Sequence, residues 1–356
     1  MRDDYSPQIR TYVDILLNMR KEKDDTVNTA ADVLLKTGKT MQDDYLQGLA
    51  LYARCFVYYR SGHAMQAYDL LRSALSHLLK TQTWPQIIGI LNMIGLVSMR
   101  MGNTASAMEA YLQGLAFAEE HNLSEQITLM NINLADVCLR ADAYGNAYAY
   151  VQKAESLLDQ LRLNERYEEY ATIAIAECAL LASFTKQEED AGRYISLVQE
   201  LIKEYPSAAS NPTMMILELY RTKKPADSYD CAKKLLPVMK RNDILDEGGT
   251  EFLFYLRYLS QHNYKDLFYQ ISSYFIHALG PDSLPGDVIP PLQVIVAFDE
   301  DTGNHERFLN DLQLLWKYTR LSNASNREST IQYIETRSVL MDTVRKNHEL
   351  KTSDRK

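Results

Sequence analysis

Residues 91–114 read LNMIGLVSMRMGNTASAMEAYLQG, and this stretch decides the fold. Its arginine and several of its small residues recur 40 residues earlier and 40 residues later. A fixed period of this length is typical of a repeat protein in which each repeat buries its apolar face against its neighbours. The sequence therefore predicts an all-α solenoid. The recurring sets are Arg60, Arg100 and Arg140; Gly62, Gly102 and Asp142; Ala67, Ala107 and Ala147; and Ala74, Gly114 and Ala154.

The order of bulky, small and aromatic residues within each period resembles the tetratricopeptide repeat, in its longer bacterial form of about 40 residues. HEAT-type repeats also have a period near ~40–47 residues, but the spacing of the small residues favours the tetratricopeptide pattern. The resemblance implies a right-handed helical-repeat solenoid with the first helix of each repeat on its concave surface. The matching residues are Leu51, Cys55, Tyr58, Gly62, Ala67, Leu71 and Ala74; Leu91, Ile94, Gly95, Ser98, Gly102, Ala107, Tyr111 and Gly114; and Leu134, Ala135, Cys138, Asp142, Ala147, Val151 and Ala154.

Four segments can be distinguished along the chain. Residues 1–40 contain a helical pair that can cap the array, because a terminal repeat must cover the exposed core. Residues 41–204 hold about four regular repeats, and residues 205–321 continue as divergent helical repeats with a Pro-rich break at 280–291. Residues 322–356 are expected to form one helix, either a simple cap or a coiled-coil connector that also allows a homodimer.

Composition and the absence of targeting segments favour a cytoplasmic protein, and the resemblance implies that it binds other proteins or peptides. The net charge of −9 and the pI near 5.4 argue against a nucleic-acid partner, which requires a basic surface. The N-terminus lacks the pattern of a secretion signal, and no apolar run has the length of a membrane helix, so we expect no membrane partner. The four cysteines are widely spaced and form no CxxC or Cys/His pattern, so neither a metal site nor a cofactor is expected.

Helical periodicity gives each first helix a side that points away from its packing face, and the resemblance implies that this side lines the concave groove. This side combines apolar residues with an edge of arginines that recurs once per repeat. Such a surface would suit an extended peptide with apolar anchors and with carboxylates or phosphates along one edge. The candidate binding residues are Arg60, Arg100, Arg140, Phe56, Met93, Leu96, Leu129, Asn133 and Asp136. The fourth repeat adds Ile173, Glu177, Leu180 and Phe184 to the same side.

A structural role competes with binding at each of these positions. The arginines lie in the last turn of their helices, where the helix dipole favours a cation. The apolar residues can be buried by self-packing of a tightly wound array or under the terminal segments. Asn133 and Asp136 can be ordinary solvated or capping residues.

No catalytic motif accompanies the repeats, so we expect these residues not to form an enzyme. The histidines show no HExxH spacing, and there is no phosphate-binding glycine loop and no G-x-S-x-G elbow. By resemblance, the chain would be the sensory or regulatory module of a bacterial signalling protein, as in arrays that precede a diguanylate cyclase domain. The alternatives are a free-standing peptide receptor of the quorum-sensing type and a constitutive assembly scaffold.

Overall fold

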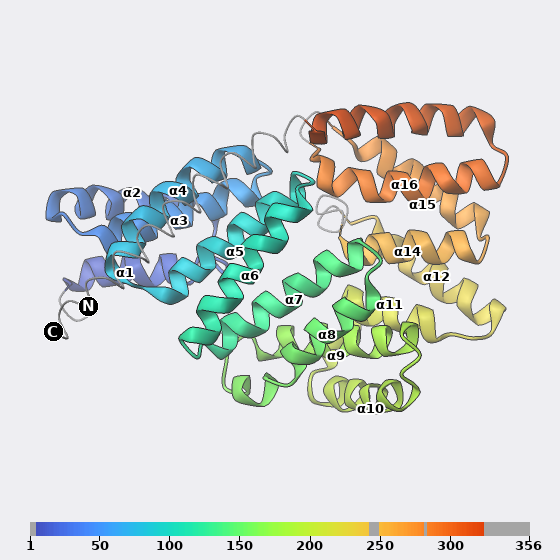
Figure 1. The fold of residues 1–356 in the computed structure, drawn as a ribbon, viewed down its shortest axis with the longest axis horizontal. Helices are drawn as coiled ribbons and strands as arrows, with labels where there is room; N and C mark the ends of the chain where they lie inside the picture. The colour runs from blue at the N-terminus through green and yellow to red at the C-terminus, as the bar shows by residue number, and fades with distance from the viewer. Residues whose placement is uncertain (1–4, 242–248, 281–282, 324–356) are drawn as a thin grey trace. The chain divides into compact units, whose positions relative to one another are not determined.

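The computed structural model describes residues 5–241, 249–280 and 283–323, and all the regular elements in these ranges are helical (Figure 1). They fall into two compact units, residues 5–121 and residues 122–323. In both units, consecutive helices pack against each other in pairs, as a helical repeat requires. No helix among the described residues combines the length and the apolar character needed to cross a bilayer.

The first unit contains six α-helices. They are α1 (Pro7–Leu17), α2 (Asp24–Met41), α3 (Asp44–Arg60), α4 (Ala64–Thr81), α5 (Trp84–Arg100) and α6 (Thr104–Glu120). The first two helices, α1 and α2, pack against each other, and α2 also packs against α3.

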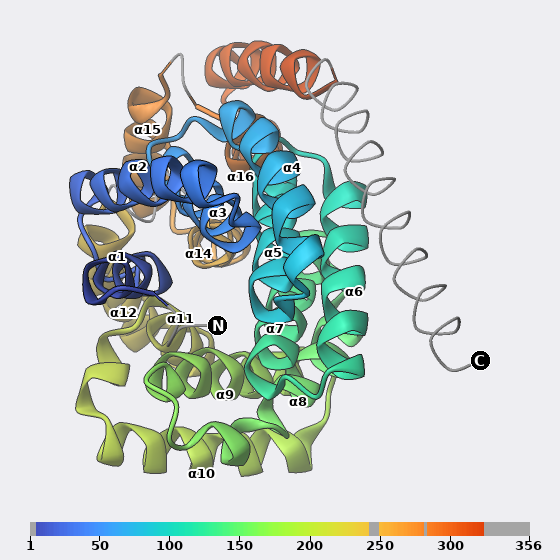
Figure 2. The same cartoon turned by 90° about the vertical axis from the view of Figure 1, so that its left-hand side faces the viewer.

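The second unit begins with α7 (Ser124–Arg140), α8 (Tyr144–Glu155), the 3-10 helix η2 (Leu158–Leu161), α9 (Tyr167–Phe184) and α10 (Glu188–Glu204). It continues with the 3-10 helix η3 (Pro206–Ser210), α11 (Pro212–Arg221), α12 (Pro225–Met239), α14 (Thr250–Gln261), α15 (Lys265–Ala278) and α16 (Pro285–Asp301). Residues 305–323 are also helical. Figures 1 and 2 show α9 beside both α8 and α10, which it contacts.

Two predicted segments need comment. The break predicted at 280–291 is shorter than expected, because α16 begins at Pro285. A proline in the first turn is compatible with a helix, since the amide groups there have no intrahelical partner. Pro290 and Pro291 then lie inside the helix. The helix expected over residues 322–356 lies almost wholly outside the described residues.

The turn after each first helix explains one recurring set. Gly62 and Gly102 have φ angles of 78° and 79°, and Asp142 has a φ angle of 56°. This left-handed region suits glycine, and aspartate is one of the few other residues that enter it readily. Each of these residues lies two positions after the arginine that ends α3, α5 or α7. The sequence period therefore records the point where the chain reverses between paired helices.

The recurring small residues lie where paired helices approach closely. Ala67, Ala107 and Ala147 are fully buried. Gly95 on α5 faces the ring of Tyr111 on α6, and Gly48 on α3 faces Leu78 on α4. A larger side chain at these positions would push the paired helices apart, as the repeat pattern predicted.

Candidate functional site

The first predicted arginine fastens two helices of its own unit together. Arg60, the last residue of α3, forms an ion pair with Asp24 at the start of α2 and donates a hydrogen bond of 3.2 Å to the carbonyl oxygen of Glu22. Its guanidinium also lies 4.8 Å from the centre of the Phe56 ring. Arg60 and Phe56 therefore serve the junction of α3 with the N-terminal helices, a structural role for both residues.

The other candidates in the first unit lie on α5. Arg100 lies 5.5 Å from the centre of the Tyr59 ring and donates to the Tyr59 carbonyl oxygen over 3.4 Å. Leu96 is half-buried, whereas Met93 is only 1% exposed. Met93 is thus a core residue in this structure and does not present an accessible groove surface.

In the second unit, α14 packs against the end of α7, and these contacts occupy two more candidates. Arg140 donates to Asp136 over 3.1 Å, and Asp136 also accepts a hydrogen bond from the Thr250 hydroxyl. Two turns further along α14, Arg257 forms an ion pair of 2.7 Å with Asp142, which lies just after the end of α7. Self-packing of the array therefore uses Asp136 and Arg140. Leu129 and Asn133, earlier on α7, are half-buried.

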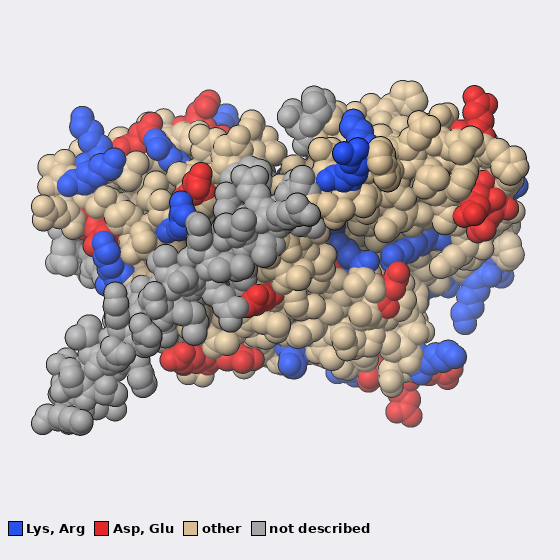
Figure 3. All heavy atoms as spheres, turned by 45° about the horizontal axis from the view of Figure 1, so that its top comes forward, with Lys and Arg blue, Asp and Glu red and all other residues tan. Residues whose placement is uncertain are grey.

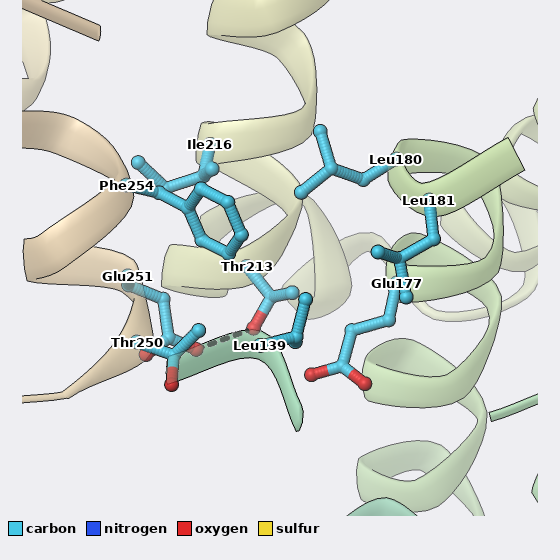
Figure 4. Close-up of a pocket in the computed structure, with 9 residues that line it drawn as sticks. All are labelled: Leu139, Glu177, Leu180, Leu181, Thr213, Ile216, Thr250, Glu251 and Phe254. Atoms are coloured by element: carbon cyan, nitrogen blue, oxygen red, sulfur yellow. Dashed lines mark hydrogen bonds between the residues drawn. The ribbon is translucent and has the colours of Figure 1, made fainter. Parts of the chain in front are cut away.

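Next to this junction, side chains from α7, α9, α11 and α14 line a cleft (Figure 4). The enclosed space is about 10 Å³, close to what one water molecule needs, and the larger empty volume of about 280 Å³ includes open solvent. Most of the lining is apolar, and the polar groups come from one threonine and one glutamate on α14, one threonine on α11 and one glutamate on α9. The lining residues are Leu139, Glu177, Leu180, Leu181, Thr213, Ile216, Thr250, Glu251 and Phe254.

Glu177 is the unusual member of this lining. Its side chain points into the cleft (Figure 4), it is 9% exposed, and its Oε2 atom has no hydrogen-bond partner among the described residues. Burial raises the pKa of Glu177 well above its ordinary value, and the nearby carboxylates of Asp136 and Glu251 raise it further. A buried carboxyl group without a partner is costly, so its presence needs an explanation.

The opposite wall of the cleft is held in place by its own contacts. The Thr213 hydroxyl on α11 donates to Glu251 on α14 over 2.7 Å (Figure 4). Phe254 packs against Phe184 and Tyr220, with ring centres 5.9 Å apart in both pairs. These contacts fix α11 and α14 beside α9, so the cleft is built on rigid helices.

The repeat spacing in the sequence identified two of the residues that line this cleft but not the others. It placed Glu177 and Leu180 on the concave side of the fourth repeat, and both line the cleft. Thr213, Glu251 and Phe254 lie beyond residue 205, where the repeat pattern fades, so sequence reasoning did not identify them. Their position depends on the packing of α14 against α7, which no local signal reveals.

No family model matches the chain, and no curated protein matches its sequence. Among the described residues, no group of three or more histidine, cysteine, aspartate or glutamate side chains is arranged to hold a metal ion. Cys55, Cys138 and Cys178 are buried, and burial raises the pKa of each thiol. On the face shown in Figure 3, the basic and acidic side chains of the described residues are interspersed.

Proposed function

We propose that this chain is a non-catalytic, cytoplasmic tetratricopeptide-type scaffold that binds a protein or peptide segment, and that the cleft beside Glu177 is its binding site. One observation carries the proposal. The cleft combines an apolar lining with a buried carboxyl group whose Oε2 atom has no hydrogen-bond partner among the described residues. Convergent polar groups in a mostly apolar, concave site are characteristic of ligand-binding sites.

The arrangement of helices supports a segment of polypeptide as the ligand. The cleft lies between α7, α9, α11 and α14, which are the first helices of successive pairs. In the repeat family that the sequence resembles, the corresponding helices line the binding groove. The same resemblance supports a regulatory module in a bacterial signalling protein, upstream of an output domain such as a diguanylate cyclase, and a homodimer through the C-terminal helix stays a prediction.

A peptide library tests the proposal directly. Immobilised protein is exposed to a synthetic library of N-acetylated hexapeptide amides, and the retained peptides are identified by mass spectrometry. The variant Thr250→Trp fills the rim of the cleft, where Thr250 is half-buried. The variant Leu163→Trp is the matched control, because Leu163 is fully exposed in the same unit.

Wild type and Leu163→Trp are expected to retain a common set of peptides that Thr250→Trp loses, while circular dichroism confirms that all three proteins are folded. Retention of the same peptides by Thr250→Trp would place binding elsewhere. Absence of any retained peptide would contradict the proposed function.

A further inference from the structure

We infer that residues 305–323, the last described helix, bind a second copy of this chain through the face that they turn away from their own unit. This inference goes beyond the proposed function and does not involve the cleft. Its starting point is a row of large apolar side chains on that face: Leu309 is 57% exposed, Leu312 is 40% exposed and Trp316 is 61% exposed. Single exposed apolar residues are common on protein surfaces, whereas a group of them marks an interaction surface.

The opposite face of the same helix attaches it to the second unit, at whose edge it lies (Figure 1). Arg307 donates a hydrogen bond of 3.0 Å to the Ser273 hydroxyl on α15 and lies 3.6 Å from the carboxylate of Asp299 on α16. Tyr318 is 3% exposed, and its hydroxyl donates to the carbonyl oxygen of Gly280 over 3.4 Å. These contacts hold the helix in place without the use of its outer face.

The exposed apolar residues form one stripe along the helix. Leu309, Leu312 and Trp316 follow the spacing i, i+3 and i+7, which places them on one side, and we call them the outer stripe. Because each residue advances the helix by about 100°, Arg307 and Tyr318 lie roughly opposite to this stripe. The outer face of a helix at the edge of a repeat array is usually polar, since no further helix covers it. Exposed leucine and tryptophan side chains at this place therefore favour a partner that covers them.

The charges beside the outer stripe favour a second copy of the chain as this partner. Glu306 and Lys317 are exposed and flank the stripe on the same side, but they lie about 16 Å apart along the helix, too far to pair within one copy. In a two-fold dimer of antiparallel helices, residues that flank the contact on the same side meet, and the interface must be self-complementary. One register, centred on Leu312, brings Leu309 of each copy against Trp316 of the other. The same register brings Glu306 of each copy to Lys317 of the other.

Sedimentation velocity of the full chain measures this association. Because one helix pair buries less surface than a standard interface, we expect a dissociation constant on the order of 10 μM, and concentrations from about 1 to 200 μM cover it. Leu312→Glu places two like charges at the centre of the interface, and its matched control is Leu163→Glu, at a fully exposed leucine of the same unit. The charge reversals Glu306→Lys and Lys317→Glu are measured singly and together, and circular dichroism confirms that every variant is folded.

We expect wild type and Leu163→Glu to dimerise alike, and Leu312→Glu to dimerise at least ~10-fold more weakly, because its two glutamates oppose each other across the two-fold axis. Each single charge reversal should also weaken the dimer by bringing like charges together, and the double reversal should restore it. A wild-type chain that stays monomeric throughout, or a Leu312→Glu dimer of wild-type strength, would overturn the inference. A double reversal that dimerises no better than the single reversals would overturn it too, because Glu306 and Lys317 would then not meet.

Discussion

The contact between Gly95 and Tyr111 gives a quantitative test of the repeat register. In Gly95→Ala, the new methyl group would lie 2.6 Å from Cδ1 of Tyr111 and closer still to two further ring atoms. The Tyr111 side chain is 1% exposed, so the ring has no solvent into which it can move. Overpacking of this kind costs about 1–3 kcal/mol, while replacing a helical glycine by alanine returns about 1 kcal/mol at most. The difference is about 0–2 kcal/mol, and because the methyl group would overlap three ring atoms, we expect a net loss in its upper half, about 1–2 kcal/mol in the free energy of unfolding.

Two companion variants isolate the steric cause. Gly192 lies in α10 with no atom within 4 Å of the position of a Cβ, so Gly192→Ala should stabilise its unit by about 0.5–1 kcal/mol. In the first unit, Tyr111→Leu removes the ring, and the cost of Gly95→Ala should fall markedly in that background. A purely local helix effect would make both glycine substitutions stabilising.

Urea unfolding followed by tryptophan fluorescence provides the measurement for the first unit. The chain has two tryptophans, and Trp84 stacks on His121 at 4.3 Å in the first unit. Trp316 belongs to the second unit and is 61% exposed, so a Trp316→Phe background leaves a signal from the first unit alone. An unchanged or higher midpoint for Gly95→Ala, or an equal cost in the Tyr111→Leu background, would refute the register.

Three further outcomes can be checked by unfolding or proteolysis. Glu177→Leu should stabilise the second unit, and the gain should grow as the pH rises above 4.5. The reason is that a carboxyl group whose pKa is raised by folding destabilises the folded state once it ionises. If the variant's melting temperature exceeded that of wild type by the same amount at pH 5 and pH 8, this reasoning would be contradicted. Burial and the neighbouring Asp311 raise the pKa of Asp299 to about 6, so wild type should lose stability as the pH rises from 3.8 through about 6. Asp299→Asn should lack this loss, and a variant with the same pH profile of stability as wild type would contradict the prediction. Arg60→Ala removes an ion pair and a ring contact, so it should weaken the docking of the N-terminal helices by about 0.5–1.5 kcal/mol. In limited proteolysis, the variant should therefore be cleaved before residue 42 faster than wild type.

The parts of the fold with local causes could be predicted from the sequence. The three recurring arginines are the last residues of α3, α5 and α7, and the glycine or aspartate two positions later adopts the left-handed turn. Both features depend on a few neighbouring residues, so they repeat in the sequence with the period of the structure. The same repeat spacing assigned Glu177 and Leu180 to one side of α9, and both residues line the cleft.

The rest depends on contacts between distant residues. Asp136 and Thr250 are 114 positions apart, and Arg60 finds its partner Asp24 36 positions earlier. No periodic signal records such pairs, because each occurs once. The sequence period therefore predicts that the arginines lie at helix ends, but it does not predict their interaction partners. These partners decide whether an arginine is available to a ligand.

The position of Glu177 within the sequence repeat has counterparts in the preceding repeats, and these counterparts show which side chains satisfy the fold there. The equivalent residues are Ala53, Met93 and Asn133. Ala53 is fully buried and Met93 is 1% exposed, so an apolar side chain satisfies packing at this position in two repeats. A buried carboxyl group without a hydrogen-bond partner destabilises the fold at neutral pH. Packing therefore does not account for the glutamate in the fourth repeat, whereas a group that donates a hydrogen bond to its Oε2 atom would offset this unfavourable burial.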